Sequence, residues 1–406
     1  MKMKFLFLFF FCIFYASAQP IPEKSIKKHI SFLASDQLKG RGTGTAEEKI
    51  AANYIIKNFE KIGLKPGSEN GTFLQVFPAK KGIPPNSKTV NASNVIGFLD
   101  NNQSKTIVIG AHYDHLGIGD QGSSLQSNST GMIHNGADDN ASGVAGMMEL
   151  AKYYSKNKIN ENYNFLFIAF SGEELGLMGS KFFLDNSILK VSNINCMINL
   201  DMIGRYREEK GVSIGGIGTS TFWENNAAKL ANDLGIKYNL DSTGIGPSDH
   251  ASFYLKDIPV LFLFTGAHPE YHKPSDDIAL INIKGEALLL KYVINVINQI
   301  NISPILDFKK TSNPHSNATK SSFKVTLGVI PDYSFDGIGL RLDGVSDGRP
   351  AEKAGIKTGD IILKIGTFDI KDVYGYMEAL SKFEKGLTVK VLLKRKEETM
   401  EVDLTF

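Results

Sequence analysis

Short apolar runs that alternate with helical patterns fill the first three quarters of the chain and restrict the folds it can adopt. The apolar runs lie at residues 106–111, 165–170, 196–200 and 260–264, and patterns with helical spacing lie at 141–154, 176–186, 221–234 and 283–300. Strands that are apolar on both faces belong inside a sheet, and alternation with helices favours parallel strands covered on both sides. The sequence therefore predicts an α/β fold, with a mostly parallel, mixed sheet and helices on both faces.

A change of composition near residue 304 predicts two domains. Residues 304–320 are rich in Lys, Ser, Thr and Asn, which is typical of a linker. The segment 19–303 is long enough for the α/β domain, and 321–406 has the short strands and glycine turns of a small β-rich domain. The 45 basic and 43 acidic side chains nearly cancel, so nothing indicates a surface for nucleic acid.

Residues 1–18 have the three parts of an export signal. Two lysines precede an apolar run at 5–15, and Ala-Ser-Ala at 16–18 provides small residues for cleavage before Gln19. The run is shorter than the roughly 20 apolar residues that a membrane-spanning helix needs. We therefore expect an exported mature chain, periplasmic or extracellular, without a transmembrane segment.

Acidic and imidazole side chains stand where the predicted strands end or the helices begin. The candidates are His112, Asp138, one of the neighbours Glu173 and Glu174, Asp201 and His272. Such groups are poorly solvated when they converge at one sheet edge, and a pair of divalent cations relieves that conflict. Mixed carboxylate and imidazole ligation suits zinc, although cobalt or manganese could substitute. Two metals that share a carboxylate favour hydrolysis by an activated water, with a further carboxylate to take its proton.

At these positions the sequence resembles the M28 family of zinc peptidases, over roughly residues 24–300. The resemblance is carried by eight segments: Leu33-Ala34-Ser35-Asp36, Gly40-Arg41-Gly42-Thr43, His112 to Asp114, residues 136–143, Glu173-Glu174, Asn199-Leu200-Asp201-Met202, Ser248-Asp249-His250 and His272. It implies a zinc exopeptidase fold and two Zn²⁺ ions per chain. Asp138 would bridge the two ions, His112 and Asp201 would complete one site, and Glu174 and His272 would complete the other.

The same resemblance implies the catalytic roles. Glu173 would be the general base and acid, and Asp114 would hydrogen-bond to the His112 ring and fix its tautomer. It also implies a cis peptide bond after Asp138. Some aminopeptidases of the family have a tyrosine shortly before the Ser-Asp-His segment, but this chain has Thr-Gly-Ile-Gly-Pro at 243–247. The expected activity is hydrolysis of N-terminal residues from peptides.

Other activities fit parts of the same pattern. A carboxypeptidase would need a cation for the substrate carboxylate, and the arginines nearest the motifs are Arg41, Arg205 and Arg207. The glutaminyl-cyclase relatives of the family bind one zinc, whereas all five ligands of a two-zinc site are present here. A non-enzymatic adaptor would lack a ligand or the base, and neither is missing. His115 and His250 are expected to shape the site rather than to bind metal.

The C-terminal segment resembles a PDZ domain. Residues 350–366 read as a short helix, a glycine turn and a strand, and 371–382 would be the helix beside the binding groove. Gly337, Ile338, Gly339 and Leu340 look like the loop that binds a peptide carboxylate, followed by the strand that pairs with the peptide. The expected ligand is a peptide C-terminus or a protein partner; the alternative is a packing domain that binds nothing.

Overall fold

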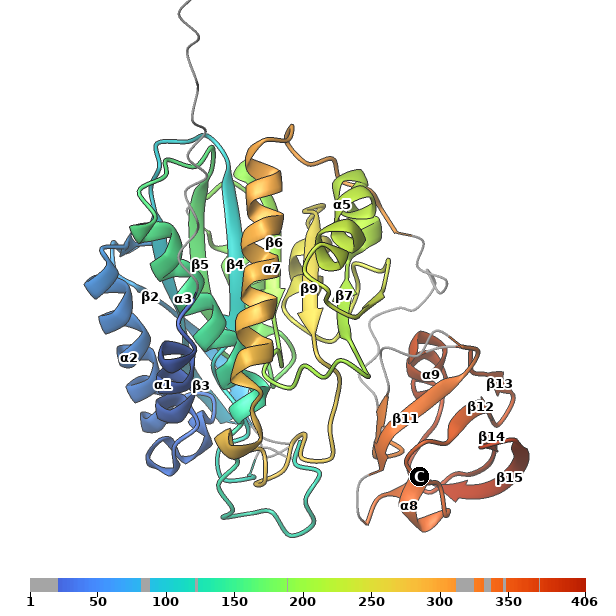
Figure 1. The fold of residues 1–406 in the computed structure, drawn as a ribbon. Helices are drawn as coiled ribbons and strands as arrows, with labels where there is room; N and C mark the ends of the chain where they lie inside the picture. Colours follow the sequence, from blue (N-terminus) through green and yellow to red (C-terminus); the bar gives the residue numbers. More distant parts are fainter. Residues whose placement is uncertain are drawn as a thin grey trace, which may run out of the picture.

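The computed structural model describes residues 21–81, 88–120, 123–187, 189–311, 325–331, 337–345, 348–371 and 373–406. An α/β domain is followed along the chain by a smaller β-rich domain (Figure 1). The expected export signal, 1–18, lies outside the described residues. Within the described ranges, no helix has the length and apolar character needed to cross a membrane.

The α/β domain is built on a nine-stranded sheet with the order β1-β3-β5-β4-β6-β9-β7-β8, and β2 pairs with β3. Its centre is parallel and fully buried: β4 (Thr106–His112), β5 (Asn164–Phe170), β6 (Ile194–Leu200) and β9 (Val260–Phe264). The flanking strands are β1 (Lys65–Pro66), β2 (Leu74–Lys81), β3 (Lys88–Leu99), β7 (Val212–Gly215) and β8 (Tyr238–Leu240). The predicted mixed, mostly parallel sheet is confirmed.

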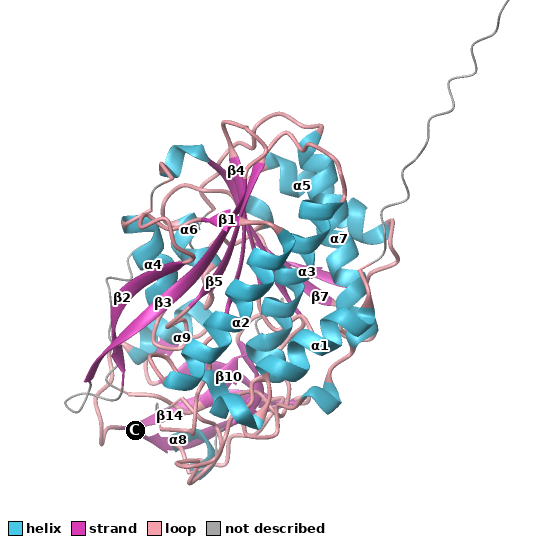
Figure 2. Cartoon of the chain, turned by 90° about the vertical axis from the view of Figure 1, so that its left-hand side faces the viewer, coloured by secondary structure: helices cyan, strands magenta, loops and turns pink. Residues whose placement is uncertain are grey.

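Helices cover both faces of this sheet (Figure 2). One face carries α1 (Glu23–Leu33), α2 (Ala46–Ile62), α3 (Gly143–Lys156), α5 (Thr221–Asn232) and α7 (Ile283–Asn301). The other face carries α4 (Met178–Asp185) and α6 (His250–Tyr254). Because side chains alternate along a strand, the neighbours Ile107 and Val108 enter different cores. Strands that bury both faces explain why the apolar runs show no alternation.

The start of α2 is joined to the segment that follows β5. Thr45 Oγ1 accepts a hydrogen bond from the Glu48 amide at 3.1 Å, and Glu48 Oε2 accepts one from the Gly44 amide at 2.6 Å. The other carboxylate oxygen of Glu48 accepts a hydrogen bond from the Ser171 hydroxyl. Burial raises the pKa of Glu48 to about 8. A helix cap thus also holds the chain two residues before Glu173.

The first part of the expected linker, 304–320, is packed against the α/β domain. Asp307 caps α5: its carboxylate accepts hydrogen bonds from the Ser220 hydroxyl at 2.9 Å and the Thr221 hydroxyl at 2.7 Å. The Thr311 hydroxyl and the Tyr254 hydroxyl lie 3.0 Å apart in a further hydrogen bond. The polar composition therefore reflects capping and anchoring up to residue 311, and 312–320 lie outside the described residues.

The second domain has its own antiparallel sheet, in the order β10-β11-β12-β14-β15, with β13 paired to β12. Its strands are β10 (Val329–Pro331), β11 (Leu340–Val345), β12 (Ile361–Ile365), β13 (Phe368–Asp369), β14 (Thr388–Arg395) and β15 (Glu398–Thr405), and its helices are α8 (Pro350–Lys353) and α9 (Val373–Leu380). A separate cluster of buried side chains, among them Leu327, Ile362 and Leu393, forms its core.

The residues predicted to form the peptide groove lie at the start of β11. Gly337, Ile338, Gly339 and Leu340 lead into this strand, which pairs with β12 through Leu340 and Arg341 and with β10 through Leu342 to Val345. Among the described residues, no strand pairs with Leu340 or Arg341 on the side away from β12. Because an unpaired side of a strand can accept an extended peptide, the pairing of this strand with a peptide stays a prediction.

Candidate metal centre

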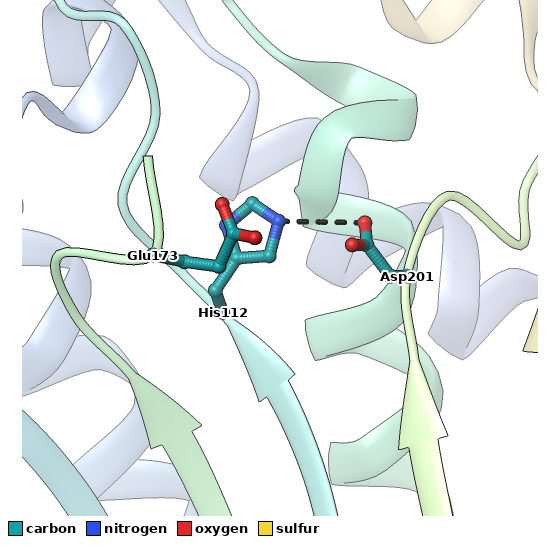
Figure 3. Close-up of side chains that lie close together, drawn as sticks. All are labelled: His112, Glu173 and Asp201. Carbon is teal, nitrogen blue, oxygen red and sulfur yellow. Dashed lines mark ion pairs between the residues drawn. The ribbon is translucent and has the colours of Figure 1, made fainter. Parts of the chain in front are cut away.

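The carboxyl ends of the parallel strands bring the predicted side chains together. His112 is the last residue of β4, Asp201 follows β6, and Glu173 lies three residues after β5. Figure 3 shows these three side chains converging, and His112 Nε2 lies 3.3 Å from Asp201 Oδ1. One ligand atom from each lies within 4.8 Å of those from the other two. Neighbouring parallel strands thus build one half of the centre.

Asp139, and not Asp138, lies between the two predicted metal sites. One of its oxygens, Oδ1, is 3.3 Å from His112 Nε2, and the other, Oδ2, is 3.2 Å from His272 Nε2. The cis peptide bond joins Asp139 to Asn140 instead of following Asp138. The expected positions of the bridging carboxylate and of the cis bond are both wrong by one residue.

Asp138 faces away from the two imidazoles. Its Oδ1 accepts hydrogen bonds from the Gly204 amide at 2.7 Å and the Ser142 hydroxyl at 3.1 Å, and its Oδ2 lies 3.2 Å from His268 Nε2. Neighbouring side chains diverge outside a helix, so only one of the pair can reach the centre. The Asp276 carboxylate accepts hydrogen bonds from the main-chain amides of Asp138 and Asp139, each at 3.0 Å, and so holds the turn that contains them.

A second group of side chains surrounds Glu174. Its Oε2 lies 3.3 Å from His272 Nε2, and its Oε1 lies 2.7 Å from His115 Nδ1. His115, Asp139 and Glu174 form the second group of ligand atoms within 4.8 Å of one another. His115 is fully buried, and sequence reasoning gave it no specific partner. The sequence feature that could have indicated this contact is the position of His115 in the segment 112–115, which lies at the end of a buried strand.

Asp114 supports the centre differently from the expectation. The His112 ring uses Nδ1 to donate to the main-chain oxygen of Asp114 at 3.1 Å, while the carboxylate of Asp114 is 3.8 Å from that nitrogen. The carboxylate instead accepts hydrogen bonds from the Glu173 amide at 3.2 Å and the Thr43 hydroxyl at 2.7 Å. The His112 tautomer is therefore fixed by a carbonyl, and the Asp114 carboxylate holds the backbone of Glu173.

Burial and neighbouring charges shift the pKa values of the adjacent residues Glu173 and Glu174 in opposite directions. Burial raises the pKa of Glu173 well above its ordinary value, and Glu174, Asp201 and Asp249 raise it further. Burial acts in the same direction on Glu174, but the His272 imidazole and a hydrogen bond from His115 outweigh it and lower the pKa to about 2. Glu174 is thus kept as a carboxylate, while Glu173 readily holds a proton.

The donor set of this centre fits zinc. Three carboxylates, Asp139, Glu174 and Asp201, and two imidazoles, His112 and His272, line one pocket and are the oxygen and nitrogen ligands that zinc accepts. Asp201 Oδ1 is buried and makes no hydrogen bond to any described residue, although it lies at ion-pair distance from His112. A buried acceptor without a donor is costly unless a cation satisfies it. His112, Asp139 and Asp201 would hold one ion, and Asp139, Glu174 and His272 the other.

The centre opens into a pocket of about 320 Å³ that is lined by the ligand side chains and by apolar residues. The apolar lining residues, called the apolar wall below, are Leu177, Met202, Pro247, Phe262, Phe264 and Ala267. The rings of Phe262 and Phe264 are parallel to within 11°, with centroids 5.9 Å apart, because alternate residues of β9 share a face. The pocket therefore places a flat apolar surface beside the ligand side chains.

Comparison with known proteins assigns the first domain. Residues 94–297, half of the chain, match the sequence model of peptidase family M28. The chain belongs to this family. Residues 314–406 match the model of a PDZ domain, so the M28 domain is followed by a PDZ domain.

The M28 domain has curated relatives of moderate identity. Leupeptin-inactivating enzyme 1 of Streptomyces exfoliatus is 28% identical over 251 residues, which cover 61% of this chain and 50% of the relative. Alkaline phosphatase isozyme conversion protein of Escherichia coli is 33% identical over 167 residues, covering 40% and 46%. The chain thus spans about half the length of these relatives.

Solved structures share the fold of the M28 domain. A zinc aminopeptidase from Bacillus subtilis superposes with a TM-score of 0.53 and 18% identity, covering 72% of this chain and 99% of that one. A glutaminyl cyclase from Bacteroides thetaiotaomicron superposes with a TM-score of 0.55 and 20% identity, covering 69% and 98%. At this level of identity the likeness shows the zinc exopeptidase fold.

His250 is expected to make the stability of this domain depend on pH. Its buried ring stacks on Phe262, with centroids 4.2 Å apart, and burial lowers its pKa to about 3. Between about pH 3 and the ordinary value near 6.5, the unfolded chain binds a proton that the folded chain does not, so stability falls as pH falls. We expect this loss to be smaller in His250→Phe, by up to about 1.4 kcal/mol per pH unit. Unfolding in urea from pH 4 to 7 measures it; parallel curves would contradict it.

Proposed function

We propose that the chain is an exported dinuclear zinc aminopeptidase that removes N-terminal residues from peptides. The observation that carries the proposal is Asp139, whose two oxygens face His112 and His272 and join two ligand groups into one centre. Membership of the M28 family supports it, as do relatives described as leucine aminopeptidases. The pattern at residues 1–18 supports export to the periplasm or beyond the cell.

The chain's own residues supply the proton transfers. Bound zinc would lower the pKa of a water and polarise the scissile carbonyl. Glu173 stands beside the ligands His112 and Asp201, where its carboxylate takes the proton of the attacking water and then passes it to the leaving amine. Its raised pKa suits a group that must hold that proton between the two steps. The Asp114 carboxylate keeps the Glu173 backbone in place.

A paired peptide assay tests the reaction. The zinc-loaded mature chain is incubated with a short peptide that has a free N-terminus and with its N-acetylated twin, and products are read by mass. Stepwise loss from the free peptide alone is the expected result. Loss of C-terminal residues from both peptides would show a carboxypeptidase. Cyclised N-terminal glutamine without hydrolysis would show a cyclase, and no reaction would favour a binding role.

The apolar wall suggests the preferred substrates. Phe262 and Phe264 lie beside the ligands on the same pocket surface, so a large apolar N-terminal side chain buries more area there than a small or charged one. Phe264→Ala is expected to lower kcat/KM for N-terminal Phe or Leu about 10-fold, with little change for N-terminal Ala. Leu255→Ala, at an exposed residue, is the control. An equal loss on all three substrates would refute the assignment of this wall.

The PDZ domain is proposed to bind the C-terminus of a peptide or of a partner protein. The proposal rests on the family match and on the start of β11, where Leu340 and Arg341 pair with β12 on one side. The unpaired side of a strand accepts an extended peptide by main-chain hydrogen bonds. Titrating a library of labelled peptides with free and amidated C-termini tests this. Equal affinity for both forms would exclude recognition of the carboxylate.

A further inference from the structure

The segment Gly40-Arg41-Gly42-Thr43 supplies no metal ligand, yet it lies against the loops that do. It joins the short helix η1 (Asp36–Arg41) to α2. Arg41 has a φ of +47°, in the left-handed region that residues other than glycine seldom adopt, and its side chain is 1% exposed. A strained backbone around a fully buried arginine persists only where the surroundings hold it, which is common beside functional sites.

The guanidinium of Arg41 joins two ligand-bearing segments. Its Nε donates to the main-chain oxygen of Tyr113 at 2.9 Å, and Nη1 and Nη2 donate to the oxygens of Asn135 and Gly136 at 2.7 and 3.1 Å. A further hydrogen bond from Nη1 reaches the oxygen of Leu33 at the end of α1. Tyr113 directly follows His112, and Gly136 comes three residues before Asp139. One side chain therefore sets the spacing between the loop of His112 and the loop of Asp139.

Main-chain contacts of the same segment strengthen this arrangement. The His115 amide donates to the Arg41 oxygen at 3.2 Å, and the Gly117 amide donates to the Gly40 oxygen at 3.0 Å. A Cβ at Gly40 would lie 2.4 Å from the main-chain oxygens of both Gly117 and His134. Only glycine lets the segment approach both loops this closely. The three pieces of chain are thus packed backbone against backbone.

The positive charge of Arg41 interacts at longer range with acidic groups of the metal centre. Among the described residues, no carboxylate lies within ion-pair distance of its guanidinium. Burial lowers its pKa to about 10, and the carboxylates that oppose this shift are those of Asp139, Asp114, Asp276 and Glu174. Arg41 thus remains a cation at neutral pH, and the acidic groups that act on it belong to the centre or hold its turns.

We propose that Arg41 is a positioning residue for the metal centre: its guanidinium fixes the loops of His112 and Asp139 at the separation that a shared pair of ions requires. The inference rests on the proposed zinc function. Lysine cannot replace this arginine, because one ammonium group cannot donate to four carbonyl oxygens that lie in different directions. Loss of the clamp is therefore expected to weaken zinc binding even where the positive charge is kept.

The test measures zinc affinity separately from folding. Arg41→Lys and Arg41→Met are compared with wild type and with Ile297→Ala, which removes a buried side chain of α7 and so serves as a destabilised control. Zinc dissociation constants come from competition with a chelator, and thermal melting of the metal-free chains reports folding. Both Arg41 variants are expected to bind zinc about 10–100-fold more weakly, while Ile297→Ala melts at a lower temperature and binds zinc normally.

Each outcome decides the inference. Arg41→Lys with wild-type zinc affinity would overturn it, whatever its melting temperature, and would leave Arg41 a residue of general stability. Because lysine keeps the charge and most of the volume, this variant decides the matter even if Arg41→Met does not fold. A wild-type chain that bound no zinc would instead overturn the metal centre itself, and the two failures are thereby distinguished.

Discussion

Replacing Glu173 with glutamine is expected to lower kcat by roughly 100- to 10,000-fold without releasing zinc. Glutamine has nearly the same shape and preserves the hydrogen bond that the main-chain N–H of residue 173 donates to the Asp114 carboxylate, but it cannot take a proton from water. The Glu173 side chain lies beside the proposed zinc ligands, but neither of the two ligand sets includes it. Steady-state kinetics on a peptide with a free N-terminus, together with the zinc content of the purified chain, measures both parts.

The neighbour Glu174 provides the matched comparison. Glu174→Gln makes the same chemical change one residue away. The carboxylate of Glu174, however, is hydrogen-bonded to His115 and lies next to His272. It is expected to lose zinc affinity as well as activity. If Glu173→Gln kept activity within a few-fold of wild type, or if it lost zinc like Glu174→Gln, the role of proton carrier would have to move to another residue.

The two aspartates of the Asp138-Asp139 pair are expected to differ sharply when each is changed to asparagine. Asp139→Asn should lose zinc and activity by more than the roughly 10–100-fold that removal of an outer partner costs, because both oxygens of Asp139 face imidazoles of the centre. Asp138→Asn should retain zinc, because the Asp138 side chain accepts a hydrogen bond from the Gly204 amide and faces His268. Zinc titration and kcat/KM of both variants measure the difference.

The stability of each variant provides the control for this pair. Both side chains are buried, so both changes are expected to lower the melting temperature of the metal-free chain. Added zinc should raise the melting temperature of Asp138→Asn and leave that of Asp139→Asn almost unchanged. The reverse pattern would restore Asp138 as the bridging residue.

The fold could be predicted from the chain because its central strands bury both faces. Runs such as 165–170 and 260–264 carry no polar residue that could face water, and this property alone favours a covered parallel sheet. The ends of those strands then locate the ligands to within a residue. What the pattern leaves open is the direction of each side chain. Asp138 and Asp139 are chemically the same, and the backbone turn that separates them depends on Asp276.

Partners far apart in sequence account for the other differences. His115 meets Glu174 across 59 residues, and Asp307 caps a helix that begins 86 residues earlier. From composition alone, such residues are predicted to lie on a polar surface or in a linker. The sequence does not show which amide or hydroxyl group each of them will contact. In the PDZ domain, glycine spacing identified the type of domain, whereas the order of its strands follows from pairings that spacing does not determine.

The hydrogen bond between Thr311 and Tyr254 holds the chain on the M28 domain up to the last described residue before the PDZ domain. The 13 residues from 312 to 324 connect this anchor to Val325, and such a length reaches at most about 45 Å even when fully extended. For the proposed aminopeptidase, a peptide held by its C-terminus at the PDZ domain within this reach would have an effective concentration near the pocket in the millimolar range. Its proposed N-terminal cleavage would then be processive until the peptide became too short to reach both sites.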